Sequence, residues 1–377
     1  MRPMRIWAVA RKEFLHVFRD ARSLGMAIAI PMMMLMLFGY ALTLDVDRVP
    51  LVVWDQSGTQ QSRDLIAQFA GSRYFSLRAY LANNGEITSA IDSGRALAAM
   101  VIPRDYAERL SSGRDAEVQL IVDGSDSNTA TIALGYAEAV TETYSQNLVI
   151  KAIRRSGGPA LQQPLEVQPR VWFNEDLESR NFIIPGLIGV LMMVIAALMT
   201  SLTVAREWER GTMEQLISTP VKGPELIIGK LIPYFSIAFF DVLLAVLTSQ
   251  FLFHVPLRGS VLFLFGMTVV FLIGAMSMGM VISISTKNQL LASQFAMVAT
   301  YLPSFLLSGF MFSISNMPKP IQIVTYAVPA RYFVYLLKGI YLKGVGFEVM
   351  KSEAILLGVY AVVAFSVAIL RFKKKLV

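Results

Sequence analysis

The sequence contains no cysteine and only two histidines, His16 and His254. The missing cysteines exclude disulfide bonds, thiolate catalysis and zinc sites with sulfur ligands. Two imidazoles are too few for a multi-histidine metal site within one chain. Charged residues are also scarce, at 16% of the chain, whereas 55% of the residues are hydrophobic. This balance is typical of a membrane protein and not of a set of soluble domains.

The sequence also lacks the patterns of an enzyme. Serine, histidine and aspartate form no arrangement typical of a triad, and no pair of carboxylates is placed for acid–base work. The nearest approach to a nucleotide-binding loop, 223–231, has one residue too many and carries Leu231 where a Ser or Thr must contact Mg²⁺. We therefore expect no enzymatic activity and no cofactor in this chain.

The formal net charge of +7 is concentrated near the two ends of the sequence. Basic residues are not gathered on one soluble face with interleaved aromatics, so nucleic acid is not an expected partner. Lys and Arg beside a span resist translocation, which predicts that both termini lie in the cytoplasm. The residues concerned are Arg2, Arg5, Arg11, Lys12, Arg19, Arg22, Arg371, Lys373, Lys374 and Lys375.

The first run without a charge, 23–44, is long enough to cross a hydrocarbon core of ~30 Å. A secretory signal peptide is the alternative, but its apolar region would be only ~7–15 residues long and would end in small residues. We favour an uncleaved first crossing. The preceding segment, 1–22, places apolar and basic side chains on opposite helical faces, which predicts an interfacial helix on the cytoplasmic membrane surface.

Residues 45–180 have the composition of a soluble domain, in which acidic residues outnumber basic ones and Lys151 is the only lysine. This acidity suits the outer side of a membrane. Helical stretches separate short β-rich runs, so we expect an extracytoplasmic α/β domain with a mostly parallel or mixed sheet. The expected strands are 49–54, 74–81, 96–102 and 118–122, and a long helix is expected at 128–155.

Five further crossings complete the predicted fold class, a polytopic α-helical membrane protein of six transmembrane helices with an inserted extracytoplasmic α/β domain. The second crossing is 181–205, and 206–230 is a charged cytoplasmic segment. Residues 231–377 hold the third to sixth crossings, expected at 231–253, 261–284, 290–312 and 354–370. Within them, the outer loop 313–352 is too apolar for a solvated loop, so part of it is expected to be re-entrant.

The cytoplasmic segment is the most informative part of the chain. Thr212 is expected to cap a short helix, with Glu214 and Gln215 near its positive end and Pro220 after it. A short charged helix between two spans suits a groove on a cytoplasmic partner. A solvated loop helix is the alternative interpretation.

At these residues the sequence resembles the permease subunits of ABC-2 type exporters. The resemblance lies in Glu207-x-Glu-x-Gly-Thr-x-Glu-x-Leu-x-x-Thr-Pro220, continues to Lys230, and recurs in the stretch from Pro329 to Gly339. The motif Arg11-Lys-Glu-Phe14 and the large domain between the first and second crossings also fit, and that domain marks a subgroup of the family.

The resemblance implies that two permease subunits, identical or paralogous, associate with two cytoplasmic P-loop ATPases that hold ATP and Mg²⁺. It further implies that the link after the second crossing touches the ATPase, and that the protein lies in a bacterial inner membrane. A periplasmic adaptor is a candidate further partner beside the lipid bilayer. The residues expected to couple to the ATPase are Glu207, Glu209, Arg210, Gly211, Thr212, Glu214 and Gln215.

Asp241 is the one formal charge well inside a predicted span. A charge at that depth is costly, so it must pair, protonate or face water. We consider it a candidate for the substrate path or for assembly, and a structural hydrogen bond to a neighbouring helix is the alternative.

Two hypotheses about function follow. The first is an ATP-driven export permease that moves a hydrophobic or amphipathic substrate out of the cytoplasm or inner leaflet. The second is a membrane-anchored sensor or envelope-assembly scaffold whose outer domain binds a ligand or partner. The second hypothesis explains the outer domain but not the need for five further crossings.

The predicted topology is testable with a reporter that is active only outside the cytoplasm. We expect activity when it is inserted near Ser112 or Gly158, and none after Lys222 or at Val377, because charge asymmetry places the last two inside. Activity at Val377 would mean an odd number of crossings.

Overall fold

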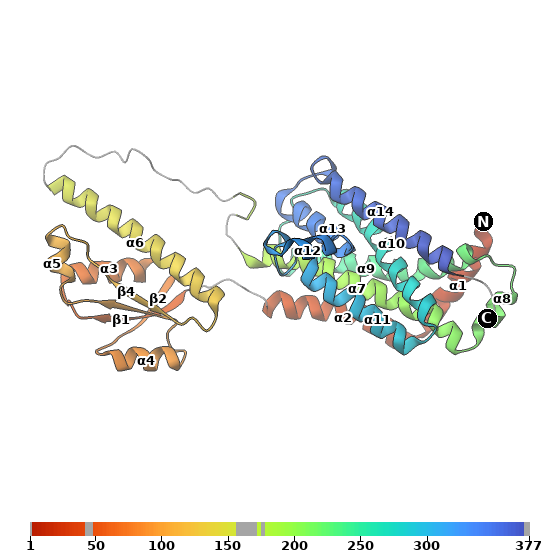
Figure 1. Cartoon of the computed structure of the whole chain (residues 1–377), viewed down its shortest axis with the longest axis horizontal. Coiled ribbons are helices and arrows are strands. Elements are labelled where there is room, and N and C mark those ends of the chain that lie inside the picture. Colours follow the sequence, from red (N-terminus) through yellow and green to blue (C-terminus); the bar gives the residue numbers. More distant parts are fainter. Residues whose placement is uncertain (1, 42–47, 156–171, 175–177, 373–377) are drawn as a thin grey trace. The chain divides into compact units, whose positions relative to one another are not determined.

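The computed structural model describes the chain except residues 1, 42–47, 156–171, 175–177 and 373–377 (Figure 1). The chain forms two compact units. The first joins Met1–Thr43 to Arg170–Val377 and is helical, and the second is Leu44–Pro169. The predicted return segment after residue 155 and the end of the predicted first crossing, 42–44, lie outside the described residues.

The described part of the helical unit contains six helices that are long and apolar enough to cross a membrane. The predicted class of fold, with six such helices and an inserted α/β region, is confirmed. The six helices are α2 (Ala21–Ala41), α7 (Ser179–Glu209), α9 (Gly223–Phe251), α10 (Val261–Thr286), α11 (Gln289–Leu307) and α14 (Phe347–Arg371).

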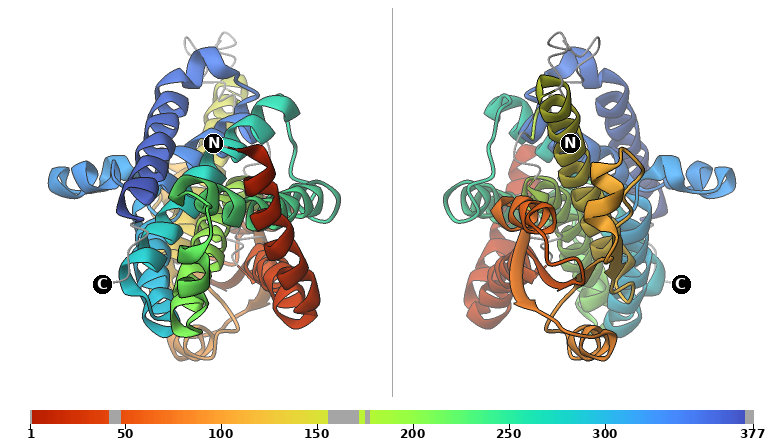
Figure 2. Two further views of the ribbon diagram at one scale, coloured as in Figure 1. Left: turned by 90° about the vertical axis from the view of Figure 1, so that its right-hand side faces the viewer. Right: turned by 90° about the vertical axis from the view of Figure 1, so that its left-hand side faces the viewer.

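Shorter helices precede α2, lie between α7 and α9, and fill the segment between α11 and α14. They are α1 (Pro3–Arg19), α8 (Thr212–Ser218), the 3-10 turn Ile314–Asn316, α12 (Lys319–Thr325), α13 (Pro329–Lys338) and the π turn Gly339–Lys343. Helix α1 packs along α9, and α13 packs against α7, α10 and α14. The left panel of Figure 2 views the helical unit from the end that carries α1 and α8, which we call the α8 end.

Several helices extend beyond the apolar runs that predicted them. Helix α7 continues to Glu209, and α9 begins at Gly223 and not at 231, so the non-spanning link is shorter than the predicted 206–230. Helix α14 likewise begins at Phe347, ahead of the predicted 354. At its far end α11 stops early, at Leu307, before Gly309 in the left-handed conformation. Helix ends carry charged residues, so hydropathy alone places them in loops.

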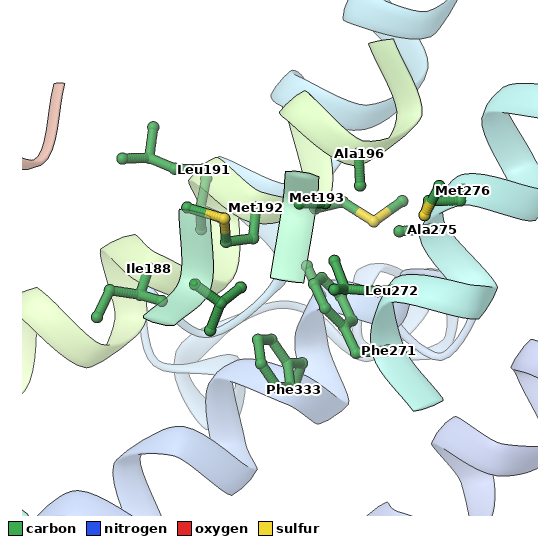
Figure 3. Close-up of a cluster of buried hydrophobic side chains, with 14 of the residues drawn as sticks. Ile188, Leu191, Met192, Met193, Ala196, Phe271, Leu272, Ala275, Met276 and Phe333 are labelled. Atoms are coloured by element: carbon green, nitrogen blue, oxygen red, sulfur yellow. The ribbon is translucent and has the colours of Figure 1, made fainter. Parts of the chain in front are cut away.

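Helix α7 lies at the centre of the core. It packs against α2, α9, α10, α11 and α13. Figure 3 shows its apolar side chains meeting α10 and α13, where the rings of Phe271 and Phe333 stack with centroids 4.0 Å apart. A Cβ at Gly279 of α10 would overlap the Ala197 carbonyl oxygen, so glycine is required for this close approach. The Thr200 hydroxyl donates to the Met276 carbonyl across the same interface, at 2.9 Å.

The second unit is a four-stranded mixed sheet with helices on both faces. Its strands are β1 (Val49–Asp55), β2 (Phe75–Tyr80), β3 (Ala98–Ile102) and β4 (Gln119–Val122), in the order β2-β1-β3-β4, with β1 parallel to β2 and β3, and β4 antiparallel to β3. Helices α3 (Gln60–Gly71), α5 (Tyr106–Ser111) and α6 (Ser127–Arg155) share one apolar core, and α4 (Asn84–Asp92) covers the other face.

Candidate functional site

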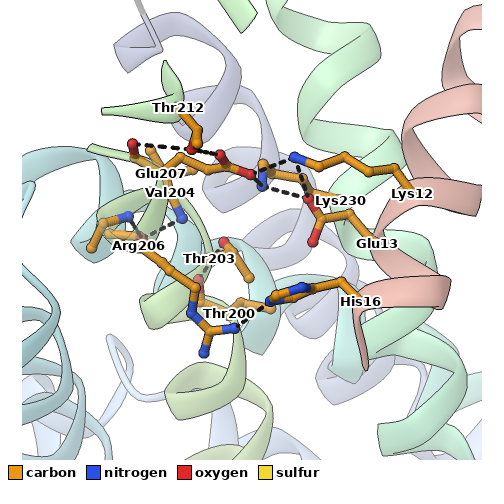
Figure 4. Close-up of polar contacts among 12 residues, drawn as sticks. Lys12, Glu13, His16, Thr200, Thr203, Val204, Arg206, Glu207, Thr212 and Lys230 are labelled. Carbon is orange, nitrogen blue, oxygen red and sulfur yellow. Dashed lines mark hydrogen bonds and ion pairs between the residues drawn. The ribbon is translucent and has the colours of Figure 1, made fainter. Parts of the chain in front are cut away.

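A buried lysine joins three helices at the α8 end. Lys230 of α9 is only 1% exposed, and its Nζ donates to Glu13 Oε1 of α1 at 2.7 Å and to Glu207 Oε1 of α7 at 3.1 Å. Lys12 Nζ of α1 donates to the same Glu207 oxygen at 2.8 Å (Figure 4). Two ammonium groups therefore balance two carboxylates, which is the condition under which buried charges are tolerated.

The other oxygen of Glu207 accepts a hydrogen bond from the Thr212 hydroxyl. We call the set Lys12, Glu13, Glu207, Thr212 and Lys230 the junction. The prediction that Thr212 caps α8 is wrong: Gly211 is the cap residue, with φ +68°, and Thr212 is the first helical residue. Because glycine adopts this left-handed conformation readily, α7 can turn into α8 over two residues while Thr212 bonds back to Glu207.

Further contacts fasten α1 to the start of α9. The Arg2 backbone N–H donates to Glu225 Oε1 at 2.9 Å, and the Lys222 N–H donates to the other oxygen at 2.9 Å. Arg5 Nη1 donates to the Pro220 carbonyl at 2.5 Å. Glu225 thus satisfies one N–H group at the start of α9 and one at the start of α1, which holds the two helix starts together.

The last turn of α7 also holds the link between α10 and α11. The two oxygens of Glu209 accept from the Gln289 backbone N–H at 2.8 Å and from its Nε2 at 2.5 Å. Lys287 Nζ lies 4.6 Å from the centroid of the Trp208 ring. Arg206 Nη1 lies 3.1 Å from His16 Nε2 of α1. Successive residues of one helix end therefore contact α1, α9 and the α10–α11 link.

Helix α8 has a buried side and an exposed side. Met213 is buried, and with Leu216 it lines a small hollow that also includes Leu226 of α9 and Phe372. Arg210, Gly211, Glu214, Gln215 and Ser218 are exposed.

The seven residues predicted to couple to an ATPase therefore divide into three groups. Glu207 and Thr212 point into the junction, Glu209 is exposed but bonded to Gln289, and the remaining four are on the surface. Sequence reasoning missed the partners Glu13, Lys12 and Gln289. The one available signal was that Lys230 adjoins an apolar run and so needs an acidic partner, but nothing in the sequence says which acid that is.

Asp241 lies within α9 with no exposed surface, and neither carboxylate oxygen has a hydrogen-bond partner among the described residues. The structural hydrogen bond that we considered as the alternative is therefore not made by any neighbouring helix in the described part of the chain. A buried carboxyl group without a partner costs free energy.

These features define a polytopic membrane protein whose spans are tied together at one end around a short exposed helix. The sequence profile of the family described as "ABC-2 family transporter protein" matches residues 22–370. The chain belongs to this ABC-2 family of transporter proteins, as its resemblance suggested.

Named relatives cover almost the whole chain. The "Probable multidrug ABC transporter permease YbhS" of Escherichia coli K12 is 37% identical over 374 residues, which cover 99% of this chain and 97% of the relative. The "Probable multidrug ABC transporter permease YbhR" of the same strain is 29% identical, covering 98% and 99%. The "Inner membrane transport permease YhhJ" of that strain is 24% identical, covering 86% and 85%. This membership favours the permease hypothesis over the sensor or scaffold.

The junction predicts that Lys230→Met has a larger effect alone than in combination with Glu13→Leu. Lys230→Met leaves two buried carboxylates with too few cations, and breaking such a pair costs about 3–5 kcal/mol. We expect a large loss of folded protein, measured by thermal unfolding in detergent. The combined change Lys230→Met with Glu13→Leu replaces the pair by apolar groups and should recover most of that loss. Equal stability of the single variant and the unsubstituted protein would contradict the structural importance of the junction.

Proposed function

We propose that this ABC-2 permease is the membrane-spanning subunit of an ATP-driven exporter in a bacterial inner membrane, with both termini and α8 in the cytoplasm. A separate P-loop ATPase hydrolyses ATP, since the sequence has no nucleotide-binding loop. The observation that carries the proposal is the arrangement at the α8 end, where a short helix with an exposed polar side is bonded through its first residue to the buried junction of three helices.

In this proposal Arg210, Glu214 and Gln215 contact the ATPase. A partner can drive the spans only through a contact that differs between its nucleotide states. When the ATPase displaces α8, the bond from Thr212 to Glu207 carries the displacement to α7, and Lys230 and Glu13 carry it to α9 and α1. Glu207 therefore transmits movement within the permease and does not touch the partner.

A second permease subunit, identical or paralogous, completes the transporter in this proposal. The exposed side of α11 supports this part of the proposal. It carries Gln294, an exposed amide side chain within a predicted membrane-spanning helix. An amide facing lipid is unfavourable, whereas an amide facing another helix finds a partner. By contrast, the exposed large side chains of α14 from Ile355 to Leu370 are all aliphatic, as expected beside lipid. The outer α/β unit remains the candidate contact for a periplasmic adaptor.

The ATPase contact is testable by charge reversal on the exposed side of α8. Glu214→Lys with Gln215→Lys should weaken binding of the co-expressed ATPase about tenfold or more, which corresponds to ~1.4 kcal/mol. Binding is measured by co-purification of the complex from detergent. Because neither side chain contacts the junction, folding should be unchanged. Glu138→Lys, on the exposed side of α6, is the control. Unchanged ATPase binding by the α8 variant would show that the exposed side of α8 is not the contact with the ATPase.

We also propose that the exported compounds are hydrophobic or amphipathic and that Asp241 belongs to their path. The word "multidrug" in the names of two relatives supports this class of substrate. A carboxyl group kept without a partner inside a span is costly, and such residues are retained where a transport pathway uses them. An opened path would bring a cationic or hydrogen-bonding part of the substrate to the Asp241 oxygens.

Asp241→Leu is expected to separate stability from transport. Removing an unsatisfied buried polar group should raise thermal stability, by an amount on the order of 1–3 kcal/mol. Efflux of tetraphenylphosphonium, a lipophilic cation, should fall in the same variant. Asp241→Asn should be milder because the amide keeps hydrogen-bonding capacity. If Asp241→Leu lowers the thermal stability, Asp241 has a structural partner. If efflux is unchanged, Asp241 is not part of the substrate path.

A further inference from the structure

We propose that Trp208 and Glu209 at the end of α7 clamp the start of α11, so that displacement of α8 reaches α11 as directly as it reaches α1 and α9. This inference rests on the proposed function and adds a second route of transmission to it. We call the contacts of Trp208, Glu209, Ser283, Lys287 and Gln289 the clamp.

The clamp runs along the last turns of α7 in three steps. Deepest is the buried Ser283 of α10, whose Oγ accepts from the backbone N–H groups of Val204 and Ala205 at 3.0 and 2.9 Å. Next, the Lys287 ammonium lies over the Trp208 ring, and last, Glu209 accepts two hydrogen bonds from Gln289. The end of α10 and its turn into α11 thus follow α7 continuously.

Glu209 supplies a hydrogen-bond acceptor that the first turn of α11 lacks. Gln289 is the first residue of α11, and the N–H groups of a first turn have no acceptor inside their own helix. Asn288 caps one of them, at Leu291, through its side chain. The Gln289 N–H is satisfied instead by the carboxylate of another helix, and a negative charge is also favoured at a helix N-terminus.

The turn that carries Gln289 is short and constrained. Lys287 has φ +54°, a left-handed conformation that non-glycine residues rarely adopt. Its side chain is also the group that contacts Trp208. A link of this kind leaves little freedom for α11 to move relative to α10, and α11 packs mainly against α7 along its length. A shift at Glu209 is therefore passed to α11.

An exchange of the two side chains tests the clamp. Gln289→Glu alone places a second carboxylate against Glu209, so repulsion should remove the side-chain hydrogen bond and leave only the bond from the backbone N–H. Adding Glu209→Gln restores the side-chain hydrogen bond, since the new amide donates to the carboxylate introduced at position 289 and the amide oxygen accepts the backbone N–H. The two variants have the same side chain at position 289, so a difference between them isolates the contact. Gln68→Glu on the exposed side of α3 is the control for the chemical change.

The first measurement uses the purified permease without any ATPase. Because the sequence has no cysteine, Arg210→Cys and Leu291→Cys can be spin-labelled uniquely, and their separation reports the distance between the end of α7 and α11. We expect a narrow distance distribution in the parent protein, a broad one with Gln289→Glu, and a narrow one again in the exchanged pair. An unchanged distribution with Gln289→Glu would overturn the clamp.

The second measurement uses the complex with the co-expressed ATPase, without the added cysteines. With Gln289→Glu, ATP hydrolysis should persist while tetraphenylphosphonium efflux falls about tenfold, and the exchanged pair should restore efflux. Efflux that stays normal in the single variant, or stays low in the exchanged pair, would refute transmission through the clamp. If no ATPase associates with the parent protein, the proposed function fails, and the distance measurement still judges the clamp by itself.

Discussion

The ammonium group of Lys230 determines how the α8 end is built. It lies in the core, where an unpaired charge is not tolerated, so carboxylates must be brought to it from elsewhere in the chain. Glu13 comes from α1, which begins the chain, and Glu207 comes from the far end of α7. Satisfying one buried cation therefore fixes the positions of α1, α7 and α9 together, and Thr212 adds α8 to the same carboxylate.

Helix α7 can pass on movement because its packing leaves it little freedom. It is buried along most of its length, and α10 approaches it so closely that Gly279 has no room for a side chain. Closely packed interiors respond to a displacement by moving elements as units, and not by deforming locally. Charged and polar groups are concentrated in its last turn, where successive side chains contact α1, α9 and the α10–α11 link.

The sequence predicted the helices and strands, which depend on local patterns. It missed the ion pairs and hydrogen bonds between residues that are distant in the chain. Long apolar runs located the six membrane-spanning helices, and β-rich runs located all four strands to within about two residues. Helix ends were less accurate: α9 begins at Gly223, before Lys230, and a charge count cannot foresee that this lysine is paired inside the helix. Glu13 and Lys230 are 217 residues apart, so no local rule connects them. Thr212 and Gly211 are both acceptable caps, and the sequence does not show that the Thr212 hydroxyl is bonded to Glu207 instead.

Helix α9 carries three buried charged residues, Glu225, Lys230 and Asp241, and the surroundings of the last two differ in kind. Lys230 has its partners within the fold, so any relative movement of α1, α7 or α9 that separates them is opposed. Asp241, eleven residues or about 16 Å further along the helix, has no partner among the described residues. A conformation or a ligand that supplies a donor to Asp241 is stabilised relative to the present one, since a group left unsatisfied in one state favours the state that satisfies it. The junction thus holds the α8 ends of α1, α7 and α9 together as one unit, while the middle of α9 remains responsive. Such a difference along one helix is expected if an ATPase acts on a permease at one end and substrate binds in the middle of the membrane.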